Sequence, residues 1–208
     1  MSDIMNNAPV DRRVRKTKQA LRQGLAELLR EKPIRDIKVR ELVERVDVSR
    51  GTFYLHYRDL YDLLEQVEAE MGAEILAILK AHDPGETWKS AYGILVDLFT
   101  YLAENSPMCT VLLGPNGDSS FVNRLKNLVR ETCLNEWGRY YGGSIDFDRA
   151  YFHSFVLASW FGLFETWLET GMRETPQTMA ALAEALIQHG VKGNPAASAP
   201  GREGTRNR

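Results

Sequence analysis

Residues 49–57 concentrate polar and aromatic side chains that can hydrogen-bond to a nucleic acid. Arg50 is the candidate for reading a base, because an arginine can grip the edge of a guanine with two hydrogen bonds. Thr52, Tyr54 and His56 carry the donors that phosphate oxygens accept. The chemistry that this run predicts is therefore contact with the bases and the backbone of DNA.

Two short helices must position these side chains. Upstream, apolar residues repeat at helical spacing at Val39, Leu42, Val43 and Val46. Ser49 is a good N-cap for a following helix. Only Asp47-Val48 separates the two segments, and Asp tolerates the left-handed conformation of a tight turn. The pattern predicts a helix-turn-helix that offers its second helix to a major groove.

The faces of the second helix can be separated by spacing. Phe53 and Tyr57 lie four residues apart on one face, so we expect both to bury against the first helix. Gly51 lets the backbone approach DNA, and Leu55 can contact a thymine methyl group or simply pack. The alternative is a small helix capped by Ser49, with its polar side chains merely solvated.

A basic helix precedes this motif. Asp11 is its predicted cap, and its apolar stripe runs to about Arg30 through Val14, Leu21, Leu25, Leu28 and Leu29. Its first turns carry Arg12, Arg13, Arg15, Lys16 and Lys18. Cations there oppose the helix dipole, and phosphate contact is a reason to accept that cost. A solvated face is the alternative.

Net charge divides the chain in the same way. The whole chain carries −2, but residues 1–60 hold 14 Lys and Arg against 9 Asp and Glu, a charge of +5. Residues 61–208 hold 12 against 19, a charge of −7. A basic N-terminal part on an acidic remainder fits a DNA-binding head on a body that does not bind DNA.

The runs 37–42 and 48–57 resemble the DNA-binding domain of the TetR family of transcriptional regulators. The resemblance covers about Arg13 to Met71, and its most diagnostic part is Phe53-Tyr54 followed by His56-Tyr57. Spacing and resemblance together give the candidate DNA contacts Arg13, Lys16, Lys18, Ser49, Arg50, Gly51, Thr52, Tyr54, Leu55, His56 and Arg58.

Three departures from the family pattern affect the motif. Lys38 stands where the family usually has a Thr cap, a loss of about 1 kcal/mol. Val46-Asp47 replaces Ala-Gly in the turn. Leu60 replaces a phosphate-binding Lys, and Arg58 is the candidate to take over that contact.

The predicted fold is all-α, with an N-terminal three-helix helix-turn-helix domain and a C-terminal helical ligand and dimerisation domain. We expect a mobile arm over 1–10, the DNA-binding domain over 11–58, a connecting helix over 59–82, a regulatory and dimerisation domain over 83–190, and a disordered tail over 191–208. Within the body, helices are predicted over 86–105, 108–113, 119–141, 146–169 and 176–189.

Residues 151–168 are apolar on nearly all sides, and one domain rarely covers such a helix completely. The family pairs its last two helices as a four-helix bundle, which implies a homodimer. The predicted interface is Phe155, Ala158, Gly162, Trp167, Met179, Leu182, Ala183 and Leu186. An internal core helix is the alternative.

The resemblance also implies a small-molecule effector within the body. Its candidate lining is Tyr92, Phe99, Met108, Trp137, Tyr141, Phe152, Phe155 and Trp160, with His153 or Asn105 as a polar anchor. No charged cluster marks this lining, so a neutral or weakly polar ligand is expected. Plain core packing is the competing interpretation, and a family-like scaffold controlled by a protein co-regulator through residues 108–120 is the competing function.

Catalysis and cofactor chemistry find little support. Asp146, Asp148, Glu165 and Glu169 read as helix starts and solvated faces, and no Glu-x-x-His pair exists for a di-iron bundle. Cys109 and Cys133 show no metal spacing, so no metal and no cofactor is expected. An α-helical enzyme stays a remote alternative.

The chain shows no signal peptide, and its longest apolar run is too short to span a bilayer. The expectation is a cytoplasmic, dimeric repressor of transcription. It would bind a palindromic operator on double-stranded DNA and be released by its effector.

Overall fold

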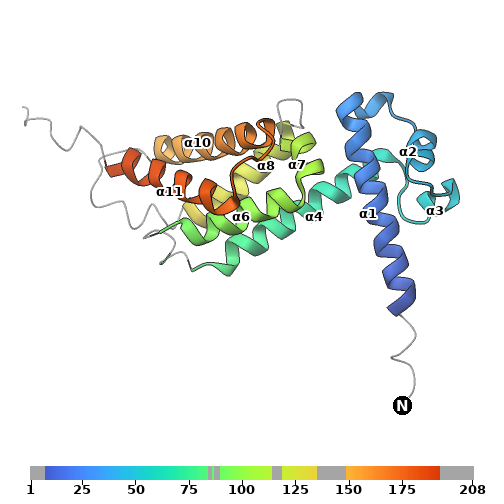
Figure 1. The fold of residues 1–208 in the computed structure, drawn as a ribbon, viewed down its shortest axis with the longest axis horizontal. Coiled ribbons are helices and arrows are strands. Elements are labelled where there is room, and N and C mark those ends of the chain that lie inside the picture. Colours follow the sequence, from blue (N-terminus) through green and yellow to red (C-terminus); the bar gives the residue numbers. More distant parts are fainter. Residues whose placement is uncertain (1–7, 84–85, 87–89, 114–118, 135–148, 193–208) are drawn as a thin grey trace, which may run out of the picture.

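A computed structural model describes residues 8–83, 86, 90–113, 119–134 and 149–192 of the chain. All regular elements in these ranges are helices, which confirms the predicted all-α fold. The helices form two parts, a small head at one end and a longer helical body (Figure 1). The predicted tail lies almost entirely outside the described residues.

Five elements build the head and its connection. They are α1 (Ala8–Glu31), the 3-10 turn η1 (Ile34–Asp36), α2 (Val39–Arg45), α3 (Arg50–Tyr54) and α4 (Leu60–Ala81). The N-terminal half of α1 projects beyond the compact part of the head (Figure 1). Leu21, Leu25, Leu42 and Phe53 are fully buried between the helices, so the stripe of α1 closes the small core of the motif.

The first helix starts earlier than the sequence predicts. It begins at Ala8, whereas we expected a mobile arm through Val10 and a cap at Asp11. Pro9 falls in the first turn, where its fixed φ suits a helix and its missing N–H removes no intrahelical hydrogen bond. The predicted end is confirmed, because α1 stops two residues before Pro33.

The connecting helix starts where the sequence predicts. Asp59 is its N-cap, and its Oδ1 accepts a hydrogen bond of 2.8 Å from the backbone N–H of Asp62. Leu63, Val67 and Met71 bury the face that continues into the body. This helix therefore belongs to both parts and transmits the orientation of one to the other.

The body contains α6 (Tyr92–Glu104), α7 (Ser106–Leu113), α8 (Ser119–Val129), the π-helical turn η2 (Arg130–Leu134), α10 (Arg149–Glu169) and α11 (Pro176–Lys192). The predicted helices over 108–113 and 176–189 are confirmed within a few residues. The predicted extension of 119–141 beyond Leu134, and residues 146–148, lie outside the described ranges.

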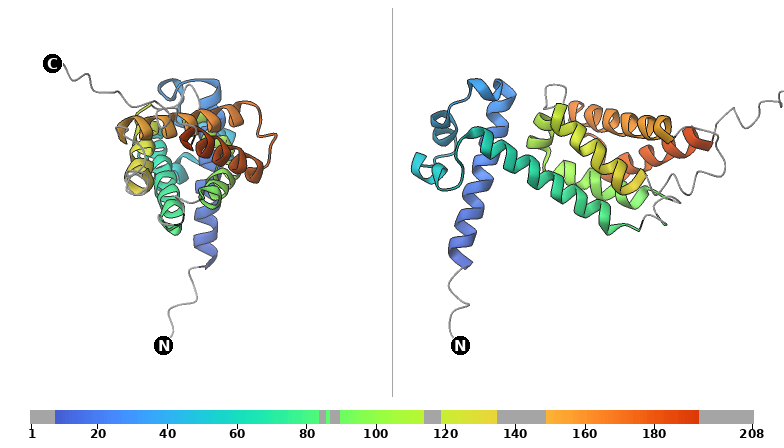
Figure 2. Two further views of the ribbon diagram at one scale, coloured as in Figure 1. Left: turned by 90° about the vertical axis from the view of Figure 1, so that its left-hand side faces the viewer. Right: turned by 180° about the vertical axis from the view of Figure 1, so that it is seen from behind.

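Aromatic rings fill the centre of the body. The Phe99 ring lies 4.5 Å from Phe164 and 5.2 Å from Trp167, centroid to centroid. Helix α11 packs against α6, and α10 lies alongside it in two views (Figures 1 and 2). The head meets the body where α1 packs against α7. The recognition motif is thus held by α4 and by this second contact.

Candidate nucleic-acid interface

The cap of the recognition helix α3 forms as predicted. Ser49 Oγ accepts a hydrogen bond of 3.0 Å from the backbone N–H of Thr52, and the two hydroxyls lie 2.8 Å apart. Because Thr52 is held by the cap, its hydroxyl has a fixed position at the start of the helix. This arrangement fixes where α3 begins and therefore the direction in which its first side chains point.

The turn before α3 also has the predicted geometry. Asp47 adopts φ 52°, in the left-handed region that Asp tolerates better than most residues. At the start of α2, Lys38 makes no side-chain cap, but the second hydrogen bond of a capping box forms. The Glu41 carboxylate accepts a hydrogen bond of 2.9 Å from the backbone N–H of Lys38. The departures from the family pattern therefore leave the motif intact.

The two faces of α3 separate as the spacing predicts. Phe53 is fully buried and Tyr57 nearly so, with ring centroids 5.7 Å apart. On the other side, Arg50 is exposed, and Tyr54 and Leu55 are exposed to 58% and 80%. Two large apolar side chains on the surface of a small domain require a reason, and contact with another molecule supplies one.

The residues after α3 form a hydrogen-bonded corner. The Asp62 carboxylate accepts from the Arg58 backbone N–H at 2.8 Å and from its guanidinium at 3.2 Å, and these bonds hold the pKa of that carboxyl below its usual value. His56 is half-buried beside Tyr57. Leu60 is buried, so the position at which the family carries a phosphate-binding Lys is part of the core here.

Ion pairs divide the cations of the head into two groups. Those around α2 are paired: Arg45 contacts Glu31 at 2.6 Å and Lys32 contacts Glu41 at 2.8 Å. The other group is exposed, and no ion pair within the described ranges involves its members, which are Arg12, Arg13, Arg15, Lys16, Arg30, Lys38 and Arg50. Most of the positive charge left for phosphates thus lies on the N-terminal half of α1 and on α3.

Lys18 and Arg22 connect α1 to the recognition motif. The Lys18 ammonium lies 5.9 Å from the centre of the Tyr57 ring, so this predicted DNA contact also supports the motif from behind. Arg22 lies beside the Tyr57 hydroxyl and forms an ion pair with Glu70 of α4. Burial raises the pKa of Tyr57, and the adjacent Arg22 opposes this rise. Sequence reasoning missed Arg22, although a charged residue between Leu21 and Leu25 on the buried stripe was a usable signal.

These features define a DNA-binding protein of the helix-turn-helix class. Comparison with known families agrees in both parts of the chain. Residues 21–67 match the model of the bacterial regulatory proteins of the tetR family, and residues 89–189 match a transcriptional regulator C-terminal region of the same family. The chain belongs to the TetR family of transcriptional regulators.

A curated relative and two solved structures are similar to the chain. An uncharacterized HTH-type transcriptional regulator, YxbF of Bacillus subtilis (strain 168), is 35% identical over 51 residues, which are 24% of this chain and 13% of YxbF. A TetR transcriptional regulator from Streptococcus agalactiae 2603V is 20% identical, with a TM-score of 0.58 over 88% of this chain and 99% of that one. A putative TetR-family regulator from Syntrophomonas wolfei is 15% identical, with a TM-score of 0.64 over 86% and 96%.

The predicted dimer residues fall on two different faces. Trp167, Met179 and Ala183 are buried in the protomer's own core, where we expected an intermolecular contact. The exposed members of the predicted set are Phe155, Ala158, Gly162, Leu182 and Leu186. A helix that is apolar all round gives no sequence signal of which side faces its own domain, so the prediction mixed both.

The described members of the predicted effector lining do not surround one common ligand-sized space, although Met108 and Asn105 line a groove beside α1. Phe99, Met108 and Trp160 are buried, and the cavity beside Phe164 has a volume of about 40 Å³. Tyr92 and Phe155 lie on the surface. Trp137, Tyr141 and the side chain of Phe152 lie outside the described residues. Here the aromatic side chains pack against one another and form core.

Two further expectations concern metals and membranes. Among the described residues, no three His, Cys, Asp or Glu side chains gather as a metal site would require. None of the helices that the structure describes is long and apolar enough to cross a membrane.

Proposed function

We propose that this protein is a homodimeric transcriptional repressor that acts in the cytoplasm, binds a palindromic operator and is released by a small-molecule effector. The observation that carries the DNA-binding part is the exposed face of α3, with Arg50, Tyr54 and Leu55 turned away from a core built on Phe53. Regulation, rather than catalysis, is the activity that these side chains support.

The dimer is supported by an exposed apolar stripe on the last two helices. Tyr151, Phe155 and Ala158 follow one face of α10 at helical spacing, and Leu182 and Leu186 do the same on α11. Phe155 and Leu186 are each about half exposed, at 52% and 51%. Pairing two such faces by a two-fold axis would remove both stripes from water.

Sedimentation of serine variants tests this dimer. We expect the wild-type chain to sediment as a dimer at micromolar concentration, and Phe155→Ser with Leu186→Ser to sediment as a monomer with intact helical content. Tyr61→Ser is the matched control, because Tyr61 is equally exposed, at 57%, but lies on α4. A monomeric wild-type protein, or dimers in all variants, would remove the proposed interface.

A two-fold dimer would present two copies of α3 to one face of DNA. Its half-sites are expected about 34 Å apart or slightly more, so that both recognition helices enter successive major grooves. A bound dimer blocks access to overlapping promoter sequence without any contact to polymerase, which is why repression is the proposed sign. Transcription in vitro from a promoter that contains the bound duplex should fall on addition of protein. An increase in transcription would indicate an activator instead of a repressor and would not contradict DNA binding.

A second candidate is a DNA-binding scaffold controlled by a protein co-regulator without any small ligand. The small volume of the cavity beside Trp160 and Phe164, about 40 Å³, favours it, since ligand sites usually measure about 300–1,000 Å³. Thermal-shift measurements with small molecules, set against capture of a protein that alters operator affinity, distinguish the two. Stabilisation by a small molecule that also weakens operator binding supports the first candidate.

A further inference from the structure

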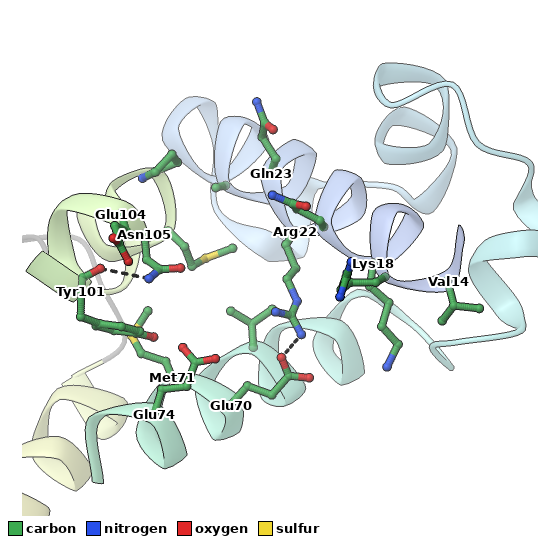
Figure 3. Close-up of a pocket in the computed structure, with 16 residues that line it drawn as sticks. Val14, Lys18, Arg22, Gln23, Glu70, Met71, Glu74, Tyr101, Glu104 and Asn105 are labelled. Carbon is green, nitrogen blue, oxygen red and sulfur yellow. Dashed lines mark hydrogen bonds and ion pairs between the residues drawn. The ribbon is translucent and has the colours of Figure 1, made fainter. Parts of the chain in front are cut away.

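A groove of ligand size lies between the head and the body. A groove of about 660 Å³ runs between α1 on one side and α4, the end of α6 and the start of α7 on the other (Figure 3). This volume is in the range of small-molecule sites, and junctions between domains are frequent places for them. Any occupant would touch the head and the body at once.

The head side of the groove is closed by Arg22. Its guanidinium forms an ion pair with Glu70 across the groove (Figure 3). The same side chain lies beside the hydroxyl of Tyr57, directly behind the recognition helix. Lys18 lines the groove beyond this ion pair, on the side away from Glu74 and Asn105 (Figure 3), and Arg15 is also part of the lining, so the groove beyond Glu70 repels cations. One side chain thus connects the motif, α1 and α4.

The body side of the groove offers hydrogen-bond acceptors. Glu74 and Glu104 line it, and Asn105 turns its amide carbonyl toward the groove while its NH₂ donates to the backbone oxygen of Tyr101 at 3.0 Å (Figure 3). The Tyr101 hydroxyl lies beside Glu74, and burial, followed by this carboxylate, raises the pKa of Tyr101. Within the described ranges no ion pair involves Glu104. The amide donor of Asn105 is already used within the protein, so this end offers a ligand the carboxylates of Glu74 and Glu104 and the Asn105 carbonyl.

The floor between these ends is apolar. Met71 of α4 and Met108 of α7 are both buried and line the groove. A thioether side chain adapts to irregular apolar ligands better than a branched one. The groove therefore suits a ligand whose N–H groups donate to the acceptors at the body end and whose alkyl chain packs on the two methionines.

We propose that this groove is the effector site and that it binds an aliphatic diamine or polyamine cation, a proposal that rests on the proposed function. One ammonium group is held between Glu74, Glu104 and the Asn105 carbonyl. The alkyl chain lies over the methionine floor. The second ammonium reaches Glu70, which is one helical turn from Glu74 on the same face of α4.

Binding at Glu70 competes with Arg22. When an ammonium group of the ligand forms an ion pair with the Glu70 carboxylate, it displaces the guanidinium of Arg22. The ion pair that connects α1 to α4 beside Tyr57 is then lost. The orientation of α3 is then less restricted relative to the body, and operator affinity falls. Because linkage is reciprocal, operator DNA must lower the affinity for the amine by the same factor.

Three probes with the same four-carbon chain test the chemistry on the wild-type protein. Calorimetric titration with 1,4-diaminobutane should show one saturable site per chain, whereas 1,4-butanediol and succinate at equal ionic strength should show none. The proposal is overturned if the diamine does not bind at up to about 10 mM, a dissociation constant that corresponds to barely 3 kcal/mol. Binding of the diol or succinate with equal affinity overturns it as well.

Charge-neutral variants locate the site. Glu74→Gln and Glu104→Gln should each weaken diamine binding by about tenfold, the loss expected for one hydrogen bond to a charged group. Glu131→Gln is the matched control, since Glu131 is exposed on η2 and does not line the groove. Equal affinities in all three folded variants place the amine elsewhere and refute the assignment. If one of the two glutamine variants fails to fold, the other variant and the three probes still test whether the groove binds the diamine.

The last arm measures the coupling to DNA. Saturating diamine should raise the operator dissociation constant of the wild-type protein, and the operator should raise the diamine constant by the same factor. In Arg22→Gln, operator binding is weaker from the start and diamine changes it little. Diamine binding without any effect on operator affinity refutes the effector role. If the wild-type protein binds the operator but not the diamine, this site is refuted and the proposed function is not affected. If the wild-type protein binds no operator, the proposed function itself is refuted.

Discussion

Gly24 marks the closest approach of α1 to α2, and adding one methyl group there tests whether that approach sets the motif. A Cβ at this position would overlap Val46 Cγ1 and lie 3.0 Å from Leu42 Cδ1. Carbon atoms pack favourably at about 3.5–4.0 Å, so at least one neighbour must move. Leu42 is fully buried and has little room to do so.

The expected cost of Gly24→Ala combines two opposing effects. Overpacking in a filled core costs about 1–3 kcal/mol. Alanine in a helix interior returns about 1 kcal/mol relative to glycine. The net result is a loss of about 0–2 kcal/mol, which for a chain of this size lowers the melting temperature by at most about 8 °C.

Gly72→Ala is the matched control for this measurement. The same substitution on α4 meets nothing within 4 Å, so only the gain in helix propensity remains and the protein should become more stable by about 1 kcal/mol. Circular-dichroism melts of both variants, with Gly24→Ala combined with Val46→Ala as a rescue, give the comparison. If Gly24→Ala is as stable as Gly72→Ala, the close packing of α1 on α2 is not as described.

Further predictions concern the cap, the thiols and the response to acid. Ser49→Ala should destabilise the head by about 1 kcal/mol and weaken operator binding, measured by melting and by DNA titration. Burial raises the pKa of Cys109 to about 12 and of Cys133 to about 11, so mass spectrometry should find neither thiol of the folded protein alkylated at about pH 8, and both after unfolding. The hydrogen bond from Arg45 lowers the pKa of Glu31 below its usual 4.5, so the contribution of this pair to stability is complete above that pH and is lost as the pH falls below it. Acid titration of Glu31→Gln should show a smaller loss than the wild type.

The helix-turn-helix was predictable because its signals are local. The Ser49 cap, the left-handed Asp47 and the burial of Phe53 and Tyr57 each depend on residues a few positions apart. Spacing and turn chemistry therefore determined them without any tertiary information. The early start of α1 was missed, because Pro9 favours a helix only as part of its first turn and reads as a break when taken alone.

Contacts between distant segments were beyond this reasoning. Arg22 meets Tyr57 and Glu70 only after three helices have packed, and the groove that they border joins residues of four elements. The residues of α10 were assigned to the wrong faces in part, since periodicity is absent where a helix is apolar all round. Phe99 was predicted to line a pocket because it is one of many large aromatic residues in the body. It is part of the core instead, because large rings in a helical body pack against each other.

Selection of bound sequences from a random duplex pool, run in parallel with the wild-type protein and Arg50→Ala, tests the central claim most directly. The wild type should select a palindrome with a defined guanine in each half-site. The folded Arg50→Ala protein should lose the preference at that position and bind the selected duplex about 1–3 kcal/mol more weakly. Identical preferences and affinities in both proteins would contradict the assignment of α3 as the element that reads the operator.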